Sequence, residues 1–253
     1  MGAGGRLWLP AAPGPGLGLL PPGARLGAAT AAADRQRTGG RAGVSVGRVW
    51  KGHRVTSRTA SAPLIVGIGG TTRPGSTSER TLVKALAAAE ALGARTRLFG
   101  GAILTRIPIY DPTTADRSPE LQDLLDGVRQ ADGVIIATPG YHGSVSGVVK
   151  NALDALEGVR GDARPYLDGR AVGCIVTADG WQAGGTALAS LRTIVHALRG
   201  WPTPLGVTFN PSASPLFDAA GELCNVRDGE MLAMLAGQVV GFARMKQALA
   251  EPA

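Results

Sequence analysis

Short apolar runs alternate with segments of helical spacing along the chain from residue 64 onward. The first run, residues 64–68, reads Leu-Ile-Val-Gly-Ile and is typical of a strand buried on both faces of a sheet. Similar runs predict further strands over residues 95–99, 133–137, 170–177 and 204–209. Apolar positions three and four residues apart predict helices over residues 78–92, 118–130, 145–156, 186–198 and 228–249. Residues 100–119, which contain three prolines, are predicted to form a loop.

The order of these elements defines the expected fold class. A strand followed by a helix, repeated along the folded part, predicts an α/β fold with a parallel sheet covered by helices on both faces. Ligands of such open sheets bind at the carboxyl ends of the strands. Three loops with unusual chemistry follow strand ends, over residues 70–78, 138–144 and 177–185. These loops are the candidate site.

The loop after the first strand reads Gly-Thr-Thr-Arg-Pro-Gly-Ser over residues 70–76 and leads into a predicted helix. A helix N-terminus presents unpaired N–H groups and partial positive charge, which together bind phosphate. The hydroxyls of Thr71, Ser76 and Ser78 add donors, and the Arg73 guanidinium can hold phosphate oxygens bidentately. The loop has neither the ending of a P-loop nor GxGxxG spacing. The alternative is an ordinary turn with a surface arginine, in which Ser76 or Ser78 caps the helix.

The positive charge of the chain is concentrated at its start. The formal net charge is +7, yet residues 1–60 hold nine of the 26 lysines and arginines and one of the 19 acidic residues. The remainder carries 17 basic and 18 acidic side chains and offers no electrostatic reason to bind nucleic acid. Residues 1–60 also hold 13 glycines and five prolines, a composition typical of disordered sequence. We expect a disordered extension over residues 1–60 and a folded domain over residues 61–253.

Three interpretations of residues 1–60 stay open. A transit peptide would be rich in arginine and poor in acids, as this segment is, but it would also be rich in serine and able to form an amphipathic helix. A secretory signal needs a longer unbroken apolar run than residues 17–20 provide. A start site placed too far upstream in a GC-rich gene accounts best for the Gly, Ala, Arg and Pro bias.

The two cysteines, Cys174 and Cys224, form no CxxC pair and no cluster of metal ligands. Isolated thiols suit a reducing compartment better than a disulfide framework, so we expect a cytoplasmic protein without a bound metal. Cys174 lies in an apolar run and is expected to be a small buried side chain. No stretch of about 18 apolar residues is present, so no membrane span is expected.

Three motifs in this order resemble those of the NADPH-dependent FMN reductase family. Residues 70–76 are similar to the family's Gly-Ser-x-Arg-x-x-Ser, with Thr71 in place of the serine. Residues 138–151 resemble its proline–tyrosine loop followed by Gly-x-x-Lys-Asn, although the family usually has a side chain at Gly140 and often asparagine at His142. Residues 177–185 resemble its third, glycine-rich loop. The resemblance covers residues 64–247.

The resemblance implies a flavodoxin-like, doubly wound, five-stranded parallel sheet in the order 2-1-3-4-5, with an FMN site. The side chains implied to hold the FMN phosphate are Thr71, Arg73, Ser76 and Ser78. The residues implied along one edge of the isoalloxazine are Pro139, Gly140, Tyr141, His142 and Gly143. The residues implied toward its pyrimidine end are Thr177, Asp179, Gly180, Gly184 and Gly185.

The resemblance also implies an enzyme, an NAD(P)H-dependent FMN reductase. Such an enzyme transfers hydride from NADPH or NADH to FMN and passes electrons to a small acceptor such as free flavin or a quinone. No catalytic side chain is expected, because the cofactor carries the chemistry. A flavin-dependent monooxygenase as recipient of reduced flavin, and assembly as a homodimer or homotetramer, are implied in the same way. Neither nucleic acid nor a membrane is expected as a partner.

Two other functions remain open. A flavodoxin-like electron carrier would bind FMN without oxidising NAD(P)H. Such carriers are usually strongly acidic, whereas the folded part of this chain is nearly neutral, which favours the reductase. A regulatory or structural protein that kept the fold without the flavin is the third class.

Overall fold

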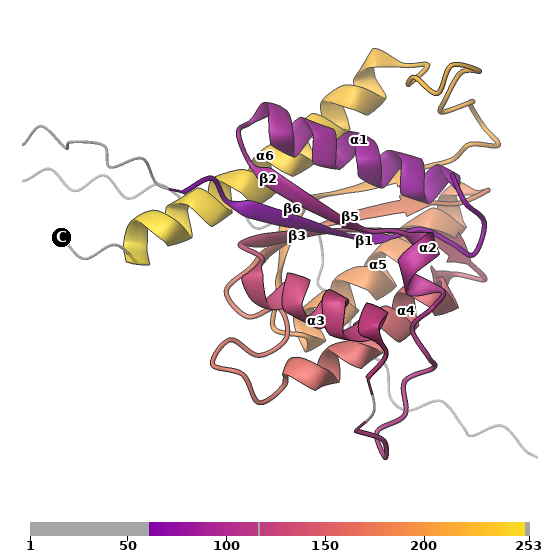
Figure 1. Cartoon of the computed structure of the whole chain (residues 1–253). Coiled ribbons are helices and arrows are strands. Elements are labelled where there is room, and N and C mark those ends of the chain that lie inside the picture. The colour runs from indigo at the N-terminus through magenta and orange to yellow at the C-terminus, as the bar shows by residue number, and fades with distance from the viewer. Residues whose placement is uncertain (1–60, 116, 251–253) are drawn as a thin grey trace, which may run out of the picture. The chain divides into compact units, whose positions relative to one another are not determined.

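The computed structural model describes residues 61–115 and 117–250, which form a parallel sheet with helices on both faces (Figure 1). The extension predicted over residues 1–60 lies outside the described residues. The parallel strands run in the spatial order β2-β1-β3-β5-β6, which is the predicted order 2-1-3-4-5 when these strands alone are numbered along the chain. Their bounds are β1 (Leu64–Gly69), β2 (Arg95–Phe99), β3 (Gly133–Tyr141), β5 (Ala171–Thr177) and β6 (Trp201–Phe209).

The helices form two layers, with α1 and α6 on one face of the sheet and α3, α4 and α5 on the other (Figure 1). Alternate side chains of each central strand serve the two layers, because successive residues of a strand point to opposite faces. In β3, Ile136 packs toward α3–α5 and Ile135 toward α1 and α6. The helices are α1 (Thr77–Ala91), α2 (Gly101–Leu104), α3 (Pro119–Gln130), α4 (Gly147–Asp154), the 3-10 helix η1 (Ala155–Val159), α5 (Trp181–Ala197) and α6 (Val226–Ala250).

The strand predicted to end at residue 137 instead continues to Tyr141. Its end pairs antiparallel with a short strand, β4 (Ser144–Val145). His142 and Gly143 form the turn and have φ angles of 50° and 81°, the positive values that a type I′ hairpin requires. The sequence pattern did not predict this hairpin, because Thr-Pro-Gly is typical of the end of a strand.

Three further boundaries differ from the predictions. The helix α2 lies inside the segment predicted as a loop over residues 100–119. The helix α5 begins at Trp181 and not at residue 186, so most of the predicted glycine-rich loop is the start of a helix. The strand β6 begins at Trp201 and not at residue 204, and it contains Pro202 and Pro204. Prolines are tolerated there because β6 is an edge strand.

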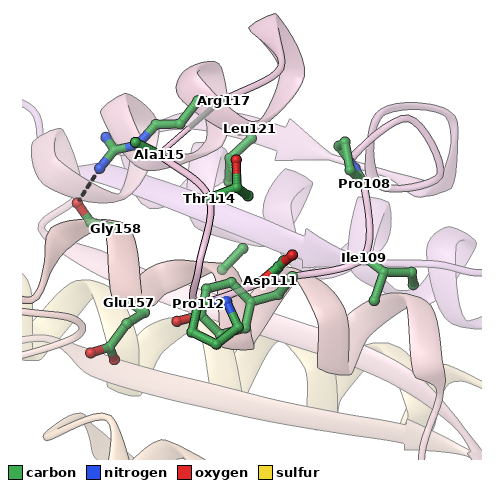
Figure 2. A pocket seen from close by; sticks show the side chains of 12 residues that line it. Pro108, Ile109, Asp111, Pro112, Thr114, Ala115, Arg117, Leu121, Glu157 and Gly158 are labelled. Atoms are coloured by element: carbon green, nitrogen blue, oxygen red, sulfur yellow. Dashed lines mark hydrogen bonds between the residues drawn. The ribbon is translucent and has the colours of Figure 1, made fainter.

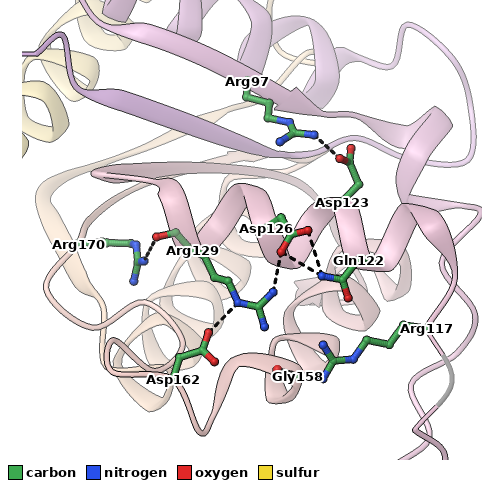
Figure 3. A network of polar contacts seen from close by, with 9 residues as sticks. All are labelled: Arg97, Arg117, Gln122, Asp123, Asp126, Arg129, Gly158, Asp162 and Arg170. Atoms are coloured by element: carbon green, nitrogen blue, oxygen red, sulfur yellow. Dashed lines mark hydrogen bonds and ion pairs between the residues drawn. The ribbon is translucent and has the colours of Figure 1, made fainter.

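A polar network joins α3 to the segment that leads into β5 (Figure 3). Arg129 donates to Asp126 at 2.7 Å and to Asp162 at 2.8 Å. Arg170 is fully buried, and its guanidinium donates to backbone carbonyls instead of a carboxylate. The carbonyls that accept, at 2.9 to 3.2 Å, are those of Arg129, Ala131, Tyr166 and Asp168. Arg170 therefore fixes the end of α3 against the start of β5.

Two further predictions concern the core and the surface. Cys174 in β5 is fully buried, as predicted, and burial raises the pKa of its thiol to about 12. Cys224 is exposed. Among the helices of the described residues, none combines the length and the apolar character needed to cross a membrane.

Candidate functional site

A cavity of about 280 Å³ lies where the loops at the carboxyl ends of β1, β3 and β5 meet. The predicted site residues that line it are Thr71, Arg73, Ser76, Ser78, Pro139, Gly140, Tyr141, Thr177 and Asp179. Thr77, Ala178 and Ala183 also line it and lie within the predicted loops, whereas Pro211 lies outside all three. Pro211 directly follows β6, so the tendency of ligands to bind at the carboxyl ends of strands could have pointed to it.

One end of the cavity is rich in hydrogen-bond donors. Ser76 is the N-cap of α1, because its Oγ accepts the Glu79 N–H at 3.3 Å. The Oγ atoms of Ser76 and Ser78 lie 3.3 Å apart, and both residues are buried. Thr71 Oγ1 accepts the Arg73 N–H at 3.0 Å, which closes a short turn and leaves Arg73 exposed. Capping and anion binding are compatible here, since a hydroxyl can accept from the backbone and still donate its proton.

Glycines bring the loop of residues 70–76 against the backbone of α2. Gly70 has a φ angle of 118°, and a Cβ there would lie 2.8 Å from the Gly101 nitrogen. A Cβ on Gly101, the first residue of α2, would lie 2.0 Å from the Thr71 carbonyl oxygen. Only residues without a side chain allow this approach. The short helix that the sequence did not reveal therefore supports the loop that carries Thr71 and Arg73.

The rest of the cavity is lined largely by small residues. Gly140 packs so closely that a Cβ there would lie 3.0 Å from the Ala178 Cβ and 3.2 Å from the Ala187 Cβ. The buried Thr138 accepts the Ser146 N–H at 2.9 Å, which fixes the end of β3 to the start of α4. Small residues such as Gly140, Ala178 and Ala183 therefore form much of this part of the lining, which suits a ring packed close to the backbone. Tyr141, also among the lining residues, is 53% exposed.

The segment after β6 closes the cavity beside Asp179. Ser212 Oγ donates to Asp179 Oδ1 at 2.8 Å, and the neighbouring Pro211 lines the cavity. The Ala178 N–H donates to the Phe209 carbonyl at 3.0 Å. Two hydrogen bonds therefore hold the ends of β5 and β6 together at this wall.

The predicted residues that are not among those lining the cavity are His142, Gly143, Gly180, Gly184 and Gly185. His142 and Gly143 form the exposed to half-exposed hairpin turn. Gly180 precedes α5, with a φ angle of 150°. Gly184 is buried, and a Cβ there would lie 2.3 Å from the Thr208 Cγ2, so its missing side chain lets α5 pack on β6. Contact between these five residues and a flavin stays a prediction.

A second cavity, of about 260 Å³, lies beside the segment that precedes α3 (Figure 2). Its arginine, Arg117, donates to the Gly158 carbonyl at 3.1 Å. Asn151 of the Lys-Asn motif positions this segment, because it accepts the Tyr110 N–H at 2.8 Å and donates to the Pro108 carbonyl at 3.0 Å. The side chain of Asn151 therefore holds the segment of Pro108 and Tyr110 against α4. The donor-rich loop of residues 70–78 does not line this cavity.

The residues of the first cavity fit FMN. Hydroxyls and a guanidinium at one end suit a phosphate, and the small residues Gly140, Ala178 and Ala183 leave room for a ring close to the backbone. Over residues 61–115 and 117–250, no group of three or more His, Cys, Asp or Glu side chains is arranged to hold a metal ion. The fold is that of a flavodoxin-like α/β protein, with a polar cavity at the carboxyl ends of its strands.

Comparison with known proteins narrows this class. Residues 63–214 match the NADPH-dependent FMN reductase family, and the chain belongs to that family, as its motifs predicted. An FMN-dependent NADPH-azoreductase of Staphylococcus aureus is 34% identical over 101 residues, which are 40% of this chain and 50% of that protein. An iron-sulfur flavoprotein of Archaeoglobus fulgidus is 33% identical over 99 residues, 39% of this chain and 48% of that protein. The chain thus spans about half the length of these curated relatives.

Solved structures share the fold. FerB, a flavoenzyme NAD(P)H:(acceptor) oxidoreductase from Paracoccus denitrificans, superposes with a TM-score of 0.59 over 73% of this chain and 98% of its own. Its sequence is 20% identical to this one. At that identity the likeness establishes the flavodoxin-like architecture alone.

Proposed function

We propose that this chain is an NAD(P)H-dependent flavin oxidoreductase that binds FMN in the cavity between residues 70–78, 139–141 and 177–179. The observation that carries the proposal is the pairing, in one cavity, of a donor-rich end with a part lined largely by glycine, alanine and proline residues. Membership in the NADPH-dependent FMN reductase family supports it. The azoreductase of Staphylococcus aureus, by its name, uses the same two cofactors.

The chain's own residues would bind and orient the cofactor. Thr71, Arg73, Ser76 and Ser78 would hold the phosphate, with Ser76 also capping α1. The backbone of Pro139 and Gly140 would lie along the ring. When bound, FMN supplies the redox chemistry, because it accepts hydride from NADPH or NADH and passes electrons to an acceptor. In this role the protein needs no acid–base side chain.

The acceptor and the partners form part of this proposal. A small oxidised molecule, such as free flavin, a quinone or an azo compound, is the proposed acceptor. Reduced flavin could also be delivered to a flavin-dependent monooxygenase. Assembly as a homodimer or homotetramer and a cytoplasmic location complete the proposal, the latter resting on the two isolated thiols.

An electron carrier that binds FMN without oxidising NAD(P)H is the second candidate function. Charge argues against it, since carriers of this fold are usually strongly acidic. The chain after residue 60 has 17 basic and 18 acidic residues. Consumption of NADPH or NADH by the purified protein, with FMN, with a quinone and without acceptor, separates the two functions. Absence of consumption under all three conditions would exclude the reductase.

Replacement of Arg73 by alanine tests the cofactor site. Loss of a charged hydrogen bond to phosphate costs about 1.5–3 kcal/mol, so FMN affinity should fall about 10- to 100-fold. Affinity for riboflavin, which lacks the phosphate, should stay within about twofold by the same reasoning. Fluorescence quenching of each flavin on binding measures both constants.

Arg106 provides the matched control. Its side chain is 71% exposed, and it is not among the residues that line the cavity. Arg106→Ala should bind FMN and riboflavin like the unmodified protein. If Arg73→Ala weakened both flavins equally, or neither, the assignment of the phosphate to this loop would be wrong.

A further inference from the structure

A third cavity, of about 420 Å³, adjoins the proposed flavin site and is larger than it. It opens between the end of β6 and the first turns of α5 and α6. Its apolar walls come from Phe209, Leu216 and Met231, and Trp181 also lines it. The Trp181 side chain is 65% exposed although it is a large aromatic group. Exposed aromatic surface beside an apolar hollow is typical of a ligand site.

The two cavities lie on either side of the same two chain segments. Asp179 lines the flavin cavity and Trp181 lines the third cavity, two residues further on. Pro211 lines the flavin cavity, and its neighbour Asn210 lines the third. Neighbouring Cα atoms are about 3.8 Å apart, so the two hollows are separated by about one layer of backbone. The Ser212–Asp179 hydrogen bond lies at this boundary. A dinucleotide with one end in each cavity would therefore cross over this boundary.

The polar groups of the third cavity are mainly donors. The guanidinium of Arg227 has no hydrogen bond or ion pair to any described residue, and the residue is exposed. Asn225 accepts the Arg227 N–H at 2.9 Å and Asn210 accepts the Ala213 N–H at 3.2 Å, both through side-chain oxygens. Their NH₂ groups remain as donors.

One carboxyl group also lines this cavity, that of Asp228. Burial raises its pKa, and the nearby Arg227 opposes this shift. A carboxylate can accept hydrogen bonds from ribose hydroxyls or an exocyclic amine. The set of groups therefore fits a ligand with an aromatic base, hydroxyls and an anionic group, and not a wholly apolar molecule.

We propose that this third cavity binds the adenosine end of NADPH, with the adenine against Trp181 and the 2′-phosphate on Arg227. The inference rests on the proposed function, since it assigns a place to the co-substrate of that reaction. The two other cavities are less suitable. Arg117 in the cavity before α3 is engaged by the Gly158 carbonyl. The remaining cavity, beside Asp132 and Gly169, lies at the amino ends of β3 and β5, away from the flavin site.

Calorimetric binding to the FMN-loaded protein tests the proposal with two probes. The probe 2′,5′-ADP carries the 2′-phosphate, and 5′-AMP lacks it. Arg227→Ala should weaken 2′,5′-ADP about 10- to 100-fold, the cost of one charged hydrogen bond to phosphate, and leave 5′-AMP within about twofold. Trp181→Ala should weaken both probes. Arg95→Ala, an exposed arginine at the start of β2, is the control and should change neither.

Steady-state kinetics provide the second readout. Arg227→Ala should raise KM for NADPH and leave KM for NADH unchanged. If the unmodified protein oxidises NADPH but Arg227→Ala changes neither KM nor 2′,5′-ADP binding, the adenosine site is wrong while the reductase function stands. If 2′,5′-ADP binds through Arg227 but neither nucleotide is oxidised, the binding site stands and the reductase function is wrong.

Discussion

The two thiols of this protein differ in burial and therefore in reactivity. Cys174 is fully buried and its thiol pKa is raised to about 12, whereas Cys224 is exposed. Since the thiolate is the reactive form, Cys174 should be inert in the folded protein. We expect a thiol reagent to modify one cysteine of the native protein and two in denaturant. Modification of Cys174 in the native state, located by peptide mapping, would contradict the structure.

The same shift predicts a dependence of stability on pH. Above the ordinary thiol pKa of 9, the unfolded chain releases the Cys174 proton and the folded chain keeps it, so stability falls as pH rises from 9 toward 12. Between pH 8 and 10 this group should remove about 1.4 kcal/mol of unfolding free energy. Cys174→Ala has no thiol at this position. The difference in unfolding free energy between the unmodified protein and Cys174→Ala should therefore shrink by about 1.4 kcal/mol between pH 8 and pH 10. Urea titrations of both proteins under reducing conditions at each pH measure it.

Residue identities also determined which parts of the site could be predicted. Arg73 and the hydroxyls around it stand in one local loop, so the sequence was enough to group them. Ala178 and Ala183 carry no polar signal and line the cavity only through the packing of distant segments. Gly184 was predicted to lie toward the pyrimidine end of the flavin, and in the structure its missing side chain lets α5 approach Thr208.

At the scale of elements, the buried Arg170 joins α3 to β5. Replacement by methionine would keep the volume and remove the Arg170 hydrogen bonds from four carbonyl oxygens, of which only that of Ala131 has a second donor among the described residues, Arg164 at 3.4 Å. We expect a loss of about 3–5 kcal/mol in unfolding free energy, because each buried acceptor left unpaired costs at least about 1 kcal/mol. Arg170→Lys should recover part of it, because an ammonium group has fewer donors and cannot match the planar guanidinium.

Chemical denaturation measures these changes, and Arg106→Met is the control. Arg106 makes a long, exposed contact with Glu120 at 3.8 Å, and exposed pairs contribute at most about 1 kcal/mol. If Arg170→Met were as stable as Arg106→Met, the hydrogen bonds of Arg170 would not stabilise the fold.

Long elements were more predictable than short ones. The helices α1 and α3 begin beside serine caps and have a clear apolar face, so their positions follow from the sequence. The short α2 and β4 have no such signal. The position of α2 is set by the contact of Gly101 with the loop of residues 70–76. The position of β4 is set by its pairing with the end of β3. Both are consequences of tertiary structure.

At the scale of the whole molecule, the alternation of strands and helices predicted the parallel sheet and the edge where the loops gather, and the family resemblance implied the strand order. The loops at residues 70–78, 138–144 and 177–185 belong to different parts of the chain, and the parallel arrangement brings them together. The third cavity could not be predicted in this way. It depends on the start of α6 meeting the end of β6, and the sequence between those elements has no regular pattern.

The outermost strands of the sheet have a consequence for self-association. An edge strand with free N–H and C=O groups can recruit a strand from another chain, which starts aggregation. Here β6 carries Pro202 and Pro204, each without an N–H, and β2 carries Arg95 and Arg97. The N–H groups that Pro202 and Pro204 lack cannot pair with an added strand at the β6 edge. At the β2 edge, the exposed Arg95 disfavours a second copy of the same strand. Within the described residues, both edges of the sheet therefore carry features that disfavour the addition of a further strand.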